Sequence, residues 1–249
     1  MVDWHVSLFD DDSSPESKKE CLLLQNKYGR RLTIIFSPRH VGIAKGLNRL
    51  IGELPPGIAI PICADLHFCS SWLPWRMIYA FLIFKVDFFF YKARHVDSVT
   101  GARMGTTGWA RKRGLQDERG KMKDFLDGKT RPSGYAVAFR ADCLKEHRYD
   151  PCLGPMCDTF LNNLMVMKSR SYYWGRVGSE TLERPGSFSG NTTKIEHGRI
   201  IRLFVCKMRR MKIHLSRHQE KRFIAHEQKV FSPKPFSEPH QKKKCSLNK

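Results

Sequence analysis

The first 65 residues alternate between short apolar runs and segments with helical spacing. The apolar runs are WHVSLF, RLTIIFS and GIAIPICAD, at residues 4–9, 31–37 and 57–65. Between them, residues 16–28 and 41–54 place apolar side chains three and four positions apart. Strand, helix, strand, helix, strand at this spacing predicts an α/β fold whose mostly parallel sheet is flanked by helices.

Carboxylates follow these apolar runs. The stretch FDDDSS places Asp10, Asp11 and Asp12 directly after the first run, and Asp65 closes the third. A single Asp or Ser would serve as a turn or helix cap before Pro15, so three consecutive acids need a further explanation. Ligands of parallel sheets bind beyond the C-terminal ends of the strands. We therefore expect these acids to lie near one binding site.

The later chain continues the pattern as far as its basic end. The apolar stretch at 72–91 is interrupted by charges, and a membrane span needs about 20 apolar residues, so we predict a buried helix followed by a strand. Residues 94–132 read as a long loop region. Residues 134–144 predict a strand and a helix start, and 158–167 predict a further helix.

The charge of the chain is unevenly distributed. Its 249 residues include 44 Lys and Arg against 24 Asp and Glu, and the excess is concentrated at the C-terminal end. We expect one α/β domain over residues 1–198, a basic helical extension over 199–226, and a disordered basic tail over 227–249.

Eight cysteines at irregular spacing lack the pairing typical of a zinc site. We expect reduced, mostly buried thiols rather than a disulfide framework. The first twelve residues, MVDWHVSLFDDD, lack the basic and apolar regions of a signal peptide. These features favour a cytoplasmic location.

Six short motifs occur in a fixed order between residues 4 and 190. They are HVSLFDDDSS, SPRHVGIAKGLN, ICADLH, WLPWRM, GYAVAFR and CDTFL. Together they resemble family 2 glycosyltransferases of the nucleotide-sugar-binding GT-A type, and WLPWRM with HVDSVTG is most similar to the bacterial rhamnosyltransferase-like branch. The resemblance implies inverting, metal-dependent transfer of a sugar, with hexosyl or deoxyhexosyl transfer as the expected reaction. The donor would be a nucleotide-diphosphate sugar based on UDP or dTDP, and the acceptor a glycan or a lipid-linked molecule.

The resemblance also implies a metal site. Asp65 and His67, in the sequence ADLH, correspond to the Asp-x-Asp motif of the family. A divalent cation between such acids and a diphosphate relieves the repulsion of like charges. Oxygen ligands suit Mn²⁺ or Mg²⁺, and replacement of the second carboxylate by imidazole favours Mn²⁺.

Further roles follow from matched positions. Asp10, Asp11, Arg39 and Gly42 correspond to nucleotide-binding positions, while the third acid of the FDDD run is assigned to the turn. Asp158, in PMCDTFL, matches the carboxylate that takes a proton from the acceptor hydroxyl. Taken singly, the same residues also fit structural roles, such as a helix cap for Asp158 or a surface charge for Arg39.

Other functions stay open from the sequence alone. Relative to the family, the chain lacks the first strand and helix, which contribute nucleotide contacts, so a catalytically inactive relative is one alternative. A basic nucleic-acid-binding protein is another, because residues 207–222 form a basic run. The acidic strand ends would repel a polyanion, however, and no nucleic-acid motif is present. The basic C-terminal region also suits an anionic membrane surface.

Overall fold

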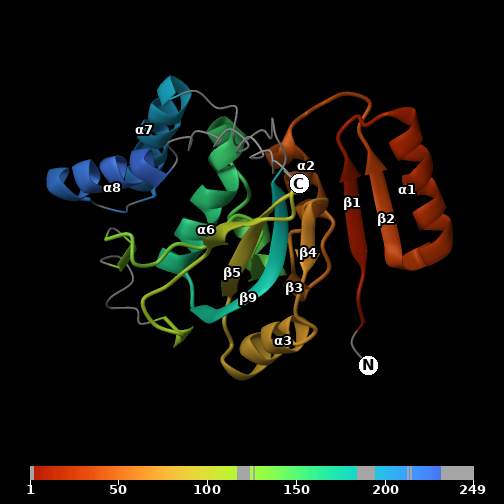
Figure 1. Ribbon diagram of the computed structural model, residues 1–249, viewed down its shortest axis with the longest axis horizontal. Helices are drawn as coiled ribbons and strands as arrows, with labels where there is room; N and C mark the ends of the chain where they lie inside the picture. Colours follow the sequence, from red (N-terminus) through yellow and green to blue (C-terminus); the bar gives the residue numbers. More distant parts are fainter. Residues whose placement is uncertain are drawn as a thin grey trace, which may run out of the picture.

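The computed structural model describes residues 3–116, 124–125, 127–183, 194–211, 213 and 215–230. Two β-sheets lie side by side (Figure 1). The smaller sheet pairs β1 (Val6–Asp10) with β2 (Leu32–Phe36) in parallel. The larger sheet has the order β3-β8-β5-β9-β4, with β6 paired to β5 and β7 paired to β9.

The strands of the larger sheet are β3 (Ile58–Ala59), β4 (Leu66–Phe68), β5 (Phe88–Asp97), β6 (Arg103–Thr107), β7 (Gly114–Leu115), β8 (Val137–Arg140) and β9 (Ser171–Glu183). The α-helices are α1 (Pro15–Tyr28), α2 (Ile43–Gly52), α3 (Leu73–Ile83), α5 (Ala141–Glu146), α6 (Cys157–Lys168), α7 (Lys194–Arg210) and α8 (Arg217–Val230). Two 3₁₀ helices, η1 (Gly29–Arg31) and η2 (Pro151–Met156), precede β2 and α6.

The expected α/β architecture of a sheet flanked by helices is confirmed. The first strand, helix, strand and helix all form, and the predicted helix after the FDDDSS turn begins at Pro15 with Ser14 as its cap. The β5–β9 pair is parallel, whereas β3, β4, β6, β7 and β8 pair antiparallel with their neighbours. The larger sheet is therefore mixed.

Two predicted segments differ from the structure. The expected third strand over 57–65 is reduced to two residues of β3, because Pro61 lacks a backbone donor for a ladder and β3 is the edge strand of its sheet. The expected loop region from Arg94 instead continues β5 to Asp97 and then forms β6 and β7. Pairing with a neighbouring strand stabilises this polar stretch, which sequence periodicity alone does not reveal.

The core lies on both faces of β5. Phe88 and Phe90 pack into one hydrophobic cluster with α6, α7 and α8, whereas Phe89 and Tyr91 pack into the other against α3. Successive side chains of a strand point to opposite faces, so the run FFFY fills both clusters. All four side chains are fully buried.

Helix α2 joins the two sheets. Gly46 packs against the Phe9 ring of β1, where a Cβ atom would lie only 2.5 Å from the ring. On the other side, Asn48 donates from Nδ2 to Tyr149 O at 2.7 Å and accepts from Tyr149 N at 2.9 Å. This two-way hydrogen bond fixes α2 to the segment before α6.

The C-terminal helices belong to the packed body. Ile213 and Phe223 are only 6% and 2% exposed, and they lie in the cluster that contains α6. These two apolar side chains of the basic segment therefore form part of the hydrophobic core. Helix α8 extends to Val230, so 227–230 of the predicted disordered tail are helical, and residues 231–249 lie outside the described part of the chain.

Cysteine burial differs from the expectation. Of the cysteines in the described residues, Cys157 is buried, while Cys69, Cys152 and Cys206 are exposed. The expectation of mostly buried thiols is therefore wrong for this part of the chain. No helix among the described residues has both the length and the apolar character that a bilayer crossing requires.

Candidate functional site

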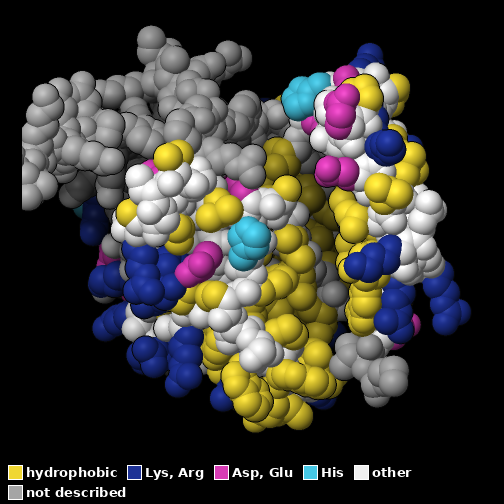
Figure 2. Space-filling view, turned by 45° about the vertical axis from the view of Figure 1, so that its right-hand side comes forward, with side chains coloured by type: hydrophobic (Ala, Val, Ile, Leu, Met, Phe, Trp, Pro, Cys, Tyr) yellow, Lys and Arg dark blue, Asp and Glu magenta, His cyan; other side chains and the backbone are white. Residues whose placement is uncertain are grey.

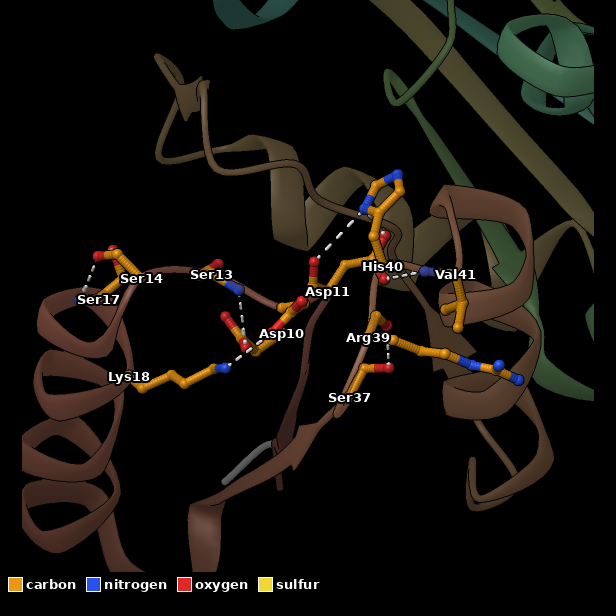
Figure 3. Close-up of polar contacts among 11 residues, drawn as sticks. Asp10, Asp11, Ser13, Ser14, Ser17, Lys18, Ser37, Arg39, His40 and Val41 are labelled. Carbon is orange, nitrogen blue, oxygen red and sulfur yellow. Dashed lines mark hydrogen bonds and ion pairs between the residues drawn. The ribbon is translucent and has the colours of Figure 1, made fainter.

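The acidic turn after β1 is a network of local hydrogen bonds (Figure 3). Asp10 is buried, and its Oδ2 accepts from Ser13 N at 3.3 Å. Asp12 has a φ of 64° and pairs with Lys18 at 3.1 Å, which is the turn role expected for the third acid.

Asp11 fastens the loop that follows β2. Its two carboxylate oxygens accept from Val41 N at 2.7 Å and from Gly42 N at 2.9 Å, and His40 Nδ1 lies 3.0 Å from Oδ2. The carboxylate of Asp11 is therefore engaged with the start of α2. Its predicted contact with a nucleotide stays a prediction.

Two more predicted nucleotide-binding residues lie on that same loop. Gly42 has a φ of 86° and precedes the first residue of α2. Such a backbone angle favours glycine, so Gly42 has a conformational reason to be there. Arg39 is exposed, its carbonyl accepts from Ser37 Oγ at 2.6 Å, and Figure 3 shows its side chain running away from Asp10 and Asp11.

The predicted metal-binding pair flanks the first residue of β4. Asp65 O accepts from Leu182 N at 3.0 Å, and His67 is the register partner of Glu180 on β9. Side chains of directly opposed residues lie on the same face of a sheet, so the Glu180 carboxylate is a neighbour of the His67 imidazole. Glu180 is paired with Arg94 at 2.5 Å.

Asp65 and His67 supply ligand atoms that suit a divalent cation, but two side chains are too few to complete its coordination. No cluster of three or more His, Cys, Asp or Glu side chains suited to a metal occurs in the described residues. Mg²⁺-type sites commonly use one or two carboxylates and complete their coordination with substrate phosphates and water. Asp65 and His67 match such an incomplete protein site.

Asp158 occupies the first turn of α6. Its Oδ1 accepts from Thr159 N at 2.5 Å and from Thr159 Oγ1 at 3.3 Å, whereas Oδ2 faces Gly134, where a Cβ atom would lie 2.7 Å away. Within the described part of the chain, Oδ2 has no hydrogen-bond partner. Burial raises the pKa of Asp158 above its ordinary value, despite the opposing hydrogen bonds from Thr159.

Tyr135 interacts electrostatically with Asp158 and with Cys63, which lies two residues before Asp65. Burial raises the pKa of Tyr135, and the nearby charges of Asp158 and Cys63 raise it further. Burial raises the pKa of Cys63 as well, together with its hydrogen bond to Asp65. The base candidate Asp158 and the thiol of Cys63, which is hydrogen-bonded to Asp65, therefore both influence the same tyrosine. No hydrogen bond or ion pair among the described residues joins this group to Asp10 or Asp11.

A hydrogen-bonded array that the sequence did not reveal lies beside Asp158. Glu183 Oε1 is 2.5 Å from His95 Nδ1, and His95 Nε2 is 2.7 Å from Thr107 Oγ1. Thr107 Oγ1 is in turn 2.6 Å from Ser133 Oγ, and Ser133 precedes the glycine that Asp158 faces. The hydrogen bond from His95 lowers the pKa of Glu183. The four residues of the array are far apart in sequence, so the motif HVDSVTG, which contains only His95, could not indicate it.

Comparison with known proteins identifies the fold class. Neither a known family model nor a curated protein matches the sequence. Among solved structures, TarS 1–349 of S. aureus gives a TM-score of 0.66 at 12% identity, covering 92% of this chain and 63% of that one. The mannosyltransferase PcManGT from Pyrobaculum calidifontis, in complex with GDP-Man and Mn²⁺, gives 0.57 at 12% identity, covering 91% and 60%. GalNAc-T7 with UDP, GalNAc and Mn²⁺ gives 0.53 at 16% identity, covering 80% and 41%.

These likenesses confirm the GT-A fold expected from the sequence motifs. Because the sequence identities are only 12% to 16%, these similarities establish the fold alone. This chain spans between two fifths and two thirds of the length of each of these proteins. Activity, donor and acceptor depend on the residues of the site rather than on the fold.

Proposed function

We propose that the protein is an inverting glycosyltransferase that uses a nucleotide-diphosphate sugar and a divalent metal ion. The observation that carries the proposal is the carboxylate of Asp158, which keeps Oδ2 without a described partner at the start of α6 in a GT-A fold. Tyr135 lies within electrostatic reach both of this carboxylate and of the segment that contains Asp65.

Asp158 would act as the general base. The acceptor hydroxyl attacks the anomeric carbon from the face opposite the diphosphate, and its proton passes to Asp158 Oδ2. Thr159 holds Oδ1 through its backbone N–H and its hydroxyl, which orients the other oxygen. Because burial raises the pKa of Asp158, the reaction rate should rise with pH as this carboxyl ionises.

Asp65 and His67 would hold the metal ion, with Mn²⁺ favoured over Mg²⁺ because one of the two ligands is an imidazole. When bound, the metal supplies positive charge for the leaving diphosphate. Solved neighbours whose structures contain Mn²⁺ support a divalent cation in this role.

The nucleotide would lie beside the loops after β1 and β2. A carboxylate at Asp10 can accept from a uracil or thymine N–H or from a ribose hydroxyl, which favours UDP or dTDP. Arg39 is free to turn toward a phosphate, and Asp11 would shape the loop at Gly42. We propose a glycan or lipid-linked acceptor and a kinship with rhamnosyltransferase-like enzymes, as the sequence motifs indicate.

A donor-turnover assay tests the proposed function. The purified protein is incubated with UDP- and dTDP-sugars and Mn²⁺, and release of the nucleoside diphosphate is measured. We expect Mn²⁺-dependent release with at least one donor, and its loss on chelation of the metal. Absence of release with every donor would instead support a catalytically inactive relative.

A further inference from the structure

Helix α3 exposes an apolar face to solvent. The expected buried helix is buried on one side only: Leu73, Met77, Ala80 and Phe81 pack against β5 and β8. The other side carries large apolar side chains at helical spacing, each 47% to 70% exposed: Trp72, Trp75, Tyr79, Leu82 and Ile83. We call these five residues the α3 outer face.

The α3 outer face is continuous with further apolar surface. Figure 2 shows hydrophobic side chains gathered over the lower end of the molecule, where α3 lies in Figure 1. Single exposed apolar side chains are common, but a contiguous group of this size marks an interaction site. Trp and Tyr in particular are enriched where a protein meets the boundary between lipid and water.

A pocket with two arginines opens at the N-terminal end of this face. It has a volume of 480 Å³ and is lined by Cys69, Ser70, Trp72, Arg76, Trp174, Arg176 and Val177. Arg76 and Arg176 are exposed, and within the described part of the chain their side chains form no hydrogen bond or ion pair. Guanidinium groups in this state are suited to phosphate oxygens.

The charges around the α3 outer face are complementary to an anionic surface. Helix α3 contains no acidic residue, and Arg76 is its one charged side chain. Lys85 is exposed just after the helix. Exposed Arg170 lies close to this segment, because Asp87, two residues after Lys85, donates from its backbone N to Arg170 O at 2.8 Å. The neighbouring acid, Asp87, is itself paired with Arg140 at 3.2 Å. Basic groups thus lie at both ends of the apolar α3 outer face.

We propose that the α3 outer face docks on an anionic lipid bilayer and that Arg76 and Arg176 bind a lipid phosphate in the adjoining pocket. Apolar and aromatic side chains would enter the headgroup boundary, while the basic groups contact anionic headgroups. Ile213 and Phe223 of the C-terminal basic segment are buried in the core, whereas Trp72, Trp75 and Leu82 are each at least 60% exposed, which favours the α3 outer face as the docking surface. The pocket begins two residues after His67, so a bound lipid headgroup would lie on the same segment as the proposed metal ligands.

Vesicle co-sedimentation tests this proposal without any donor or turnover, so its outcome is independent of the proposed function. The full chain is mixed with vesicles of phosphatidylcholine alone or with 30% phosphatidylglycerol (about one lipid in three, enough for a negative surface potential). We expect binding to the anionic vesicles.

The double substitution Trp75→Ala with Leu82→Ala should weaken vesicle binding at least ~10-fold, because both side chains are mostly exposed in the free protein and would enter the lipid. Arg76→Ala with Arg176→Ala should weaken it about 20- to 30-fold, given about 1 kcal/mol for each basic residue.

Matched substitutions on α1 and the adjoining η1 serve as controls. Leu23→Ala with Leu24→Ala removes exposed apolar side chains, and Lys19→Ala with Arg30→Ala removes exposed charges, from a different part of the surface. Neither should change vesicle binding. The proposal is overturned if the wild-type protein does not bind anionic vesicles, or if the α3 and α1 variants bind equally well. It is also overturned if light scattering shows a dimer that Trp75→Ala with Leu82→Ala dissociates while vesicle binding is absent, since α3 would then join two copies of the chain.

Discussion

Replacement of Asp158 by Asn is expected to lower kcat by about 10²- to 10⁴-fold, which is the usual contribution of a general base. The amide keeps an oxygen that can accept from Thr159 N but cannot take the acceptor proton. The free energy of unfolding should stay the same or rise at neutral pH, because burial raises the pKa of Asp158 and its ionised form therefore opposes folding. Loss of activity with retained stability is the mark of a functional carboxylate.

Asp142→Asn provides a matched control for this substitution. Asp142 also lies in the first turn of a helix, α5, but is exposed. Its substitution should leave kcat unchanged. A plain helix-capping role for Asp158 would instead give lower stability for Asp158→Asn, with kcat for the folded fraction within a fewfold of wild type. Steady-state kinetics and urea unfolding of both variants separate these results.

Replacement of Gly108 by Ala is expected to destabilise the fold by about 2–5 kcal/mol. Gly108 has a φ of 81°, which costs an L-residue about 1–2 kcal/mol. An added Cβ would also lie 2.3 Å from Tyr91 O and 3.3 Å from Ser133 Cβ. Tyr91 belongs to the central strand β5 and its backbone cannot move without disturbing both core clusters, so the contact adds about 1–3 kcal/mol.

Gly101→Ala isolates the steric part of this effect. Gly101 has a similar φ of 69°, but no atom lies within 4 Å of the position of its Cβ. Its substitution should cost only the conformational penalty of about 1–2 kcal/mol. Equal unfolding free energies for Gly108→Ala and Gly101→Ala, measured in urea, would contradict the close packing of Gly108 against β5. Because Gly108 follows Thr107, the first variant should also disturb the array that contains His95.

Much of the fold could be predicted from the sequence because its signals are local. Apolar runs and helical spacing gave β1, α1, β2 and α2, and Ser14 with Pro15 marked the start of α1. The later strands were harder to predict from the sequence. β6 and β7 are polar and short, and they exist through pairing with β5 and β9, which depends on residues distant in sequence. The exposure of one side of α3 was likewise invisible, since an apolar sequence does not show which side is covered.

The candidate site could be predicted only in part, for a similar reason. Motif positions indicated Asp65, His67 and Asp158, whereas they did not indicate Tyr135, whose pKa the nearby charge of Asp158 raises. Asp10 and Asp11 were indicated as ligand-binding acids, yet their carboxylates accept hydrogen bonds from the turn and from the loop at Gly42. Residue type and spacing cannot distinguish an acid that binds its own backbone from one that faces a ligand.

The proposed function depends above all on a metal-dependent nucleotide site that includes Asp65. Calorimetric titration of UDP and dTDP into the protein, with and without Mn²⁺, tests it most directly, with Asp65→Ala beside an Asp12→Ala control whose side chain pairs with Lys18 in the turn. We expect nucleotide binding that requires Mn²⁺, is lost in Asp65→Ala and is retained in Asp12→Ala. Binding that is the same without Mn²⁺ or in Asp65→Ala, or no binding of either nucleotide, would contradict it.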